Sequence, residues 1–237
     1  MERHRLLAAA SLILAFTFGM GRWRVKAEGG ASVYPKMAPL DQYLMPDRNA
    51  EIALARSAAP ESISHDAKVL VLGRHGYETG AEGKNGFVCL VERAWTSPAD
   101  SPEFWNPKGR APLCLNPQAA KSILPMTLKK TQFALAGQSQ TQINESTKAA
   151  YAKGELPPLE PGAMAYMMSK DAYLTDEGSH NMAHVMFYAP LMDKANWGAD
   201  LPNSPVILLG QGPPEPYNLY LVPVGRWSDG SPAPLPH

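Results

Sequence analysis

The stretch VLVLGRHGYETG, residues 69–80, places side chains that could do chemistry directly after an apolar run. The run 69–72 predicts a buried strand, and Arg74 and His75 follow at its end. An imidazole nitrogen is a nucleophile near neutral pH, and a guanidinium group matches the geometry of a phosphate. Glu78 adds a carboxylate three residues after His75. The stretch fits phosphoryl chemistry, and it fits equally an ordinary loop beside a hairpin.

The tripeptide Arg74-His75-Gly76 resembles the opening motif of the histidine phosphatase superfamily. The resemblance implies that His75 takes a phosphoryl group, that Arg74 binds its oxygens and that Glu78 is a further catalytic candidate. Such an enzyme also needs a second histidine just after a late strand, whereas His184 precedes or opens the predicted strand MAHVMFYAP. We expect no second histidine to reach His75, and we predict that His75 is a non-catalytic loop residue.

His180 and His184 are four positions apart, a spacing that places two imidazoles on one face of a helix, where they could bind a metal ion. Asp176 and Glu177 could add ligands from the preceding loop. In a strand, however, side chains four residues apart are separated by about 13 Å and cannot share an ion. Because the segment that follows is strand-like, we predict no tight metal site, and a metal-dependent enzyme remains the third hypothesis.

Cys89 and Cys114 are the only two cysteines of the chain. In an oxidising compartment such a pair favours a disulfide bond, which would stabilise the fold by about 3 kcal/mol through a loop of this length. The alternative is two separately buried thiols that pack as small hydrophobic side chains. A catalytic thiol is disfavoured because Cys89 lies in an apolar run, where burial raises a thiol pKa.

The first 27 residues have the pattern of an export signal. A charged start, MERHR, precedes an apolar run over residues 6–20, and VKA offers small residues for cleavage after Ala27. As a helix the run spans roughly 22 Å, less than the roughly 30 Å hydrocarbon core of a membrane. We therefore predict a cleaved signal and no stable membrane span after cleavage, with an uncleaved anchor as the alternative.

Charge and motif content exclude several classes of protein. The signal segment carries a net charge of +4 in a chain whose total is zero, so the remainder is acidic and has no basic block. A nucleic-acid partner is therefore not expected. The chain has no GxSxG, SxxK, Walker or GxGxxG motif, and so nothing predicts a serine hydrolase, a nucleotide site or any other cofactor. The partner and the oligomeric state are not predicted.

Hydrophobic patterns and turn residues predict an α+β fold in a single domain. Asp47 caps a helix that Pro60 ends, and helices open at Asn116-Pro117 and at the capping box of Ser139 with Gln142. Strand-like runs lie on both sides of these central helices, which favours a mostly antiparallel sheet. The predicted organisation is a signal peptide (1–27), a linker or arm (28–46), one domain (47–228) and a flexible tail (229–237).

Most of the mature chain, from ALARSAAPESIS through GRHGYETGAEGKNGFVCLVERAW to GRWSDGSPAP, resembles a group of exported bacterial proteins of unknown function. That resemblance implies export, to the periplasm or the medium, and a single domain, but no activity. We therefore expect an exported globular protein with a binding or structural role.

Overall fold

The computed structural model describes residues 33–178 and 182–235, which belong to one compact unit. The predicted signal segment and His180 lie outside the described residues. The α-helices are α1 (Arg48–Arg56), α2 (Glu61–Ser64), α3 (Pro117–Ser122), α4 (Leu124–Leu135) and α5 (Gln140–Ala152), and the 3-10 helices are η1 (Leu40–Gln42), η2 (Ala94–Thr96) and η3 (Lys194–Trp197). The strands are β1 (Lys68–Gly73), β2 (Gly76–Ala81), β3 (Val88–Glu92), β4 (Ala111–Leu115), β5 (Met164–Met167), β6 (His184–Pro190), β7 (Ile207–Gln211) and β8 (Tyr217–Pro223).

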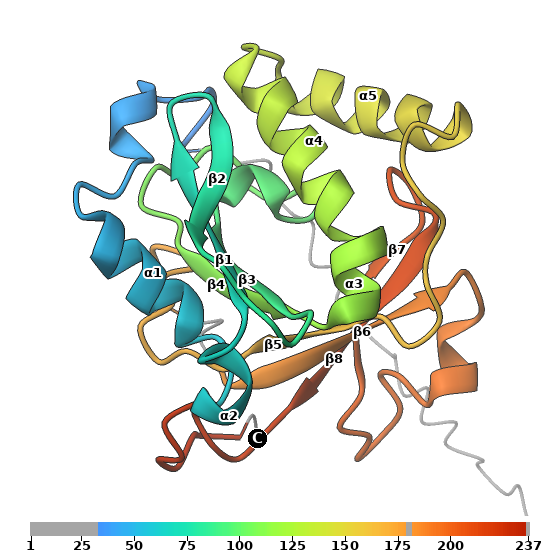
Figure 1. Ribbon diagram of the computed structural model, residues 1–237. Helices are drawn as coiled ribbons and strands as arrows, with labels where there is room; N and C mark the ends of the chain where they lie inside the picture. Colours follow the sequence, from blue (N-terminus) through green and yellow to red (C-terminus); the bar gives the residue numbers. More distant parts are fainter. Residues whose placement is uncertain (1–32, 179–181, 236–237) are drawn as a thin grey trace, which may run out of the picture. The chain divides into compact units, whose positions relative to one another are not determined.

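The eight strands form a single sheet in the order β2-β1-β3-β4-β5-β6-β8-β7 (Figure 1). The pair β1–β3 is parallel, and every other neighbouring pair is antiparallel. The predicted α+β class with a mostly antiparallel sheet is confirmed.

Helices cover the first half of the sheet on both faces, which explains why β1 is apolar without alternation. Val69 and Val71 point to α1 and α2, where they pack with Ala55 of α1 and Ile63 of α2. Leu70, on the other face, packs with residues of α3, α4 and α5. Figure 1 shows α1 on one side of β1, β3 and β4, and α4 on the other.

The helix ends follow the predicted caps. The side chain of Asp47 accepts a hydrogen bond from Asn49 N at the start of α1. Asn116 caps α3 in the same way through Ala119 N, at 2.9 Å. The capping box of Ser139 at the start of α5 is complete, which fixes the helix that carries part of the site described below.

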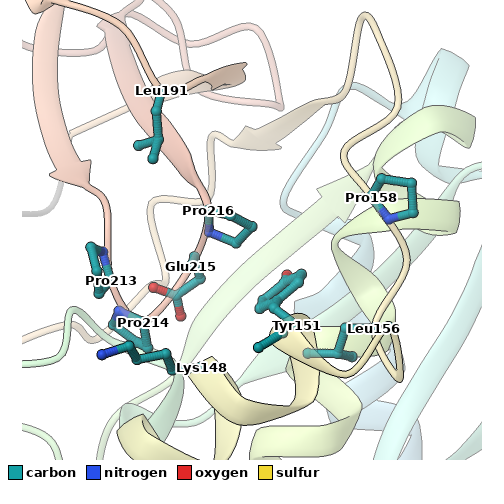
Figure 2. A pocket seen from close by; sticks show the side chains of 11 residues that line it. Lys148, Tyr151, Leu156, Pro158, Leu191, Pro213, Pro214, Glu215 and Pro216 are labelled. Carbon is teal, nitrogen blue, oxygen red and sulfur yellow. The ribbon is translucent and has the colours of Figure 1, made fainter.

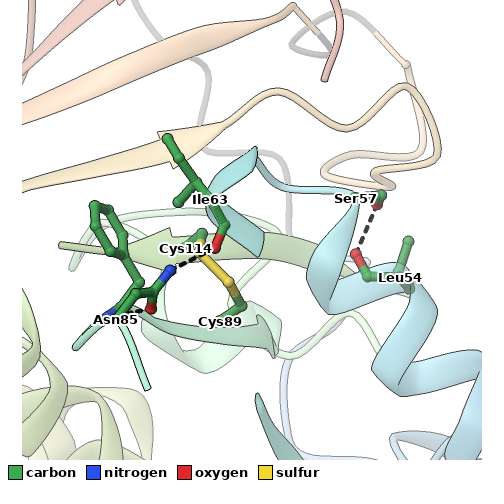
Figure 3. The surroundings of a disulfide bond; sticks show 7 residues. Leu54, Ser57, Ile63, Asn85, Cys89 and Cys114 are labelled. Atoms are coloured by element: carbon green, nitrogen blue, oxygen red, sulfur yellow. Dashed lines mark hydrogen bonds between the residues drawn. A yellow bond between two sulfur atoms is a disulfide. The ribbon is translucent and has the colours of Figure 1, made fainter. Parts of the chain in front are cut away.

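The predicted disulfide bond between Cys89 and Cys114 is present (Figure 3). The two cysteines are directly opposite each other on β3 and β4, with 4.0 Å between their Cα atoms. Both are fully buried under α1 and α2. Asn85 fixes the turn before β3, because its side chain donates to Ile63 O and accepts from Phe87 N.

The structure corrects the interpretation of the glycine-rich stretch after β1 as a loop. Residues 76–81 form β2, which pairs with β1 in a hairpin. Gly80 allows this pairing beneath α1, because a Cβ atom there would lie 2.8 Å from Val71 Cγ1 and 3.2 Å from Ile52 Cγ1. Strand β4 was not predicted at all; it places Cys114 beside Cys89.

Segments on either side of the predicted domain contact it. In the predicted arm, Tyr43 is fully buried, and its hydroxyl donates to Trp105 O at 2.8 Å. In the predicted flexible tail, Asp229 pairs with Lys170, and Ala233 N donates to Gly225 O. Among the described residues, no helix is long and apolar enough to cross a membrane.

Candidate functional site

Arg74 and His75 form the two-residue connection between β1 and β2, because Gly73 pairs with Gly76. Both side chains are exposed. Arg74 is held by Asp41, with 2.7 Å between Nη2 and Oδ1, and the Glu78 carboxylate pairs with Arg48. The arginine and the carboxylate of the motif are therefore each held by a partner from outside it.

The other described histidines do not converge on His75. His65 ends α2, before β1 begins, and its ring contacts Asp66. His184 opens β6, which is four strand spacings from β1, or roughly 19 Å across the sheet. The structure thus brings Arg74, His75 and Glu78 onto one hairpin, and no other histidine of the described residues joins them.

His184 is buried in the sheet. Its side chain is almost fully covered, and Nδ1 lies 2.7 Å from Met182 O. Burial lowers the pKa of this imidazole below its usual value. His180, the other candidate metal ligand of the sequence analysis, lies outside the described residues; within them, no group of three or more His, Cys, Asp or Glu residues is arranged to hold a metal ion.

A pocket of about 570 Å³ lies between α5 and the turn that joins β7 to β8 (Figure 2). Ala152 and its neighbours at the end of α5 form one wall, and the turn 213–216 forms the opposite one. Leu191, after β6, completes the mouth. The lining residues are Lys148, Tyr151, Ala152, Gly154, Leu156, Pro158, Leu191, Pro213, Pro214, Glu215 and Pro216.

Prolines give this pocket stiff walls. Pro158 stands on one side, and Pro213, Pro214 and Pro216 stand on the other (Figure 2). A proline ring fixes φ and removes the backbone N–H donor. The walls are therefore apolar and lose little conformational freedom when a ligand binds, which favours affinity.

A buried ion pair lies behind the pocket. Lys130 of α4 is almost fully buried, and its Nζ is 2.5 Å from Oε1 of Glu215. Glu92, at the end of β3, lies close enough to Lys130 to interact with it, and its Oε1 accepts a hydrogen bond from Thr127. Burial raises the pKa of Glu92, because the charged carboxylate is poorly solvated there.

Three tyrosines surround this ion pair. The rings of Tyr188 and Tyr217 meet edge to face, 5.6 Å apart, and Tyr151 faces them from α5. Burial raises the pKa of all three phenols, and the charge of Glu215 adds to the effect. The phenols therefore stay protonated at neutral pH, and their hydroxyl groups remain hydrogen-bond donors.

Two buried polar atoms of the pocket lining have no hydrogen-bond partner among the described residues: Glu215 Oε1, which the Lys130 ammonium neutralises, and the Tyr151 hydroxyl. Its oxygen is buried and has no hydrogen-bond partner of good geometry among the described residues. The Tyr217 phenol lies near enough to affect its pKa, but not in a well-formed hydrogen bond. In Figure 2 the Tyr151 ring stands between Glu215 and Leu156. A buried donor of this kind costs free energy unless a water or ligand accepts its hydrogen bond.

No residue of this pocket was a candidate in the sequence analysis. Besides the end of α5, its walls come from two proline-rich segments, LPPLEPG and GPPEPY, which are about 55 residues apart in the chain. Each segment alone is typical of a linker or turn. The one signal that could have drawn attention to them is that both combine adjacent prolines with a glutamate.

Comparison of this chain with protein-family models, with curated proteins and with solved structures gave no match.

Proposed function

We propose that this is an exported ligand-binding protein and that the pocket between α5 and the β7–β8 turn holds the apolar part of a small molecule. The observation that carries the proposal is the pocket itself: about 570 Å³, walled by prolines and leucines, with the unpartnered Tyr151 hydroxyl at its side. Ligand sites have this size and character, being mostly apolar with a few polar groups that orient the ligand.

Export is supported by the signal-like pattern of residues 1–27 and by the disulfide bond. Disulfide bonds persist in oxidising compartments and are rare in the bacterial cytoplasm.

A neutral fluorescent probe tests the binding function. N-phenyl-1-naphthylamine should fluoresce more strongly with the purified protein than in buffer. Ala152→Trp should abolish the increase, because Ala152 lines the pocket and an indole there would fill it. Ala149→Trp is the matched control, since Ala149 is an exposed residue of the same helix that does not line the pocket. Equal fluorescence from the two variants would disprove the assignment of the site.

The phosphohydrolase hypothesis receives no comparable support. Arg74, His75 and Glu78 are on the exposed β1–β2 hairpin, and none of them lines the pocket. A phosphoryl-transfer site would need a second proton donor within reach of the phosphate.

A further inference from the structure

The charges at the pocket do not cancel. Glu215 is neutralised by the buried Lys130, with 2.5 Å between the charged atoms. Lys148 lines the mouth, is exposed, and forms no ion pair within the described part of the chain. Glu92 also lies near Lys130, but it does not line the pocket. Lys148 is therefore the one charged side chain of the lining that has no ion-pair partner within the described part of the chain.

From this charge balance we propose that the ligand is an amphiphilic carboxylate: an apolar body with a single anionic head group bound by Lys148 and Tyr151. The inference rests on the proposed binding function and names the class of ligand. A cationic ligand is disfavoured, because Lys130 already occupies the carboxylate of Glu215 and Lys148 would repel a second cation.

The spacing of the two head-group residues fits this assignment. Lys148 and Tyr151 are three positions apart on α5, so their side chains leave the helix on the same face. An ammonium group attracts a carboxylate, while the phenol donates a hydrogen bond to one of its oxygens. The ligand would thereby give the Tyr151 hydroxyl the partner that the described residues do not provide.

The head group is a carboxylate rather than a phosphate. Phosphates in proteins are typically held by the fork of an arginine or by several backbone N–H donors. No arginine lines this pocket, and a single lysine is a point charge suited to a monoanion. The body of the ligand packs on Leu156, Leu191 and the proline rings, and the volume suits a chain of medium length.

Three probes with the same ten-carbon body test the head group: decanoate, decanol and decylamine, each used below its micellar concentration to displace the neutral dye. At low salt decanoate should bind about fivefold more tightly than decanol, the effect of one exposed charge pair. Decylamine should bind more weakly than decanol. Added salt should reduce the preference for decanoate, because it screens exposed charges.

Two lysine variants locate the effect. Lys148→Gln should lower the affinity for decanoate to that for decanol and leave decanol unchanged. Lys153→Gln is the matched control, because Lys153 is exposed at the end of α5 and does not line the pocket. It should keep the full preference.

The outcomes distinguish a failure of the carboxylate assignment from a failure of the proposed binding function. If decanol binds as tightly as decanoate, or decylamine binds most tightly, the carboxylate inference is wrong while the binding function stands. If none of the three displaces the dye and Ala152→Trp has no effect, the binding function fails, and the inference fails with it.

Discussion

At the scale of single residues, the buried pair of Glu51 and Arg93 joins four segments of the chain. Arg93 donates to Oε1 of Glu51 at 2.9 Å, and its Nε donates to Tyr43 O at 2.7 Å. The same Glu51 oxygen accepts from Leu72 N. This buried ion pair between α1 and the residue after β3 therefore links the N-terminal arm to the end of β1.

Removal of one partner should be costly, because it leaves the other charge buried and unpaired. Glu51→Ala should lower the free energy of unfolding by about 3–5 kcal/mol. Urea denaturation measures the loss, and Glu61→Ala, at an exposed position of α2, is the control. A loss below about 1 kcal/mol would show that the Arg93 charge finds water or another partner.

His184 should make the fold sensitive to acid. Burial holds the pKa of its imidazole below the usual 6.5, so the unfolded chain takes up the proton first as the pH falls. The contribution of His184 to the free energy of unfolding is therefore complete above about pH 6.5, and it is lost as the pH falls below that value. His184→Gln should therefore remove part of the stability decrease between pH 8 and pH 5. Denaturation at both pH values gives the comparison, and an identical decrease in the two proteins would contradict it.

His75 should not act as a catalyst, since it is exposed on a hairpin and no second described histidine is near. The purified protein should show no turnover of a generic aryl phosphate above buffer, and His75→Ala should be indistinguishable from it. Robust hydrolysis that this substitution abolishes, with an unchanged circular dichroism spectrum, would refute the prediction and restore the phosphatase hypothesis.

At the scale of elements, the sequence predicted what local patterns specify. The caps at Asp47, Asn116 and Ser139, together with the apolar runs of β1 and β3, have local physical causes, and they were predicted. Strand β2 was missed because GYETGA has two glycines and no hydrophobic alternation; pairing with β1 makes it a strand. The pocket was missed because its walls meet only when the sheet brings residues 156–158 and 213–216 together.

The disulfide bond should stabilise the pair β3–β4 and the helices that cover it. The double variant Cys89→Ala with Cys114→Ala should unfold with a free energy about 3 kcal/mol lower than the oxidised protein. Urea denaturation with and without reductant measures the effect. The reductant should destabilise the natural protein and leave the variant unchanged; an equal response in both would show that the bond contributes nothing.

At the scale of the whole molecule, the disulfide bond and the signal-like segment fit one route for the chain. A bond buried under α1 and α2 must form before or during folding, since oxidants cannot reach it afterwards. A chain that folds after passage into an oxidising compartment meets this condition.

Export itself should be visible at the N-terminus. Residues 6–20 form an apolar run that follows a charged start, and Ala27 closes a VKA cleavage site. Protein recovered from the exported fraction should begin at Glu28, and Ala27→Arg should block this processing because signal cleavage requires a small residue there. N-terminal sequencing of both proteins decides it. A natural protein that keeps Met1 would show an uncleaved anchor. The state of Cys89 and Cys114 then gives an independent check: the exported protein should carry the bond, and a variant without residues 2–27, which stays in the cytoplasm, should yield two alkylated thiols.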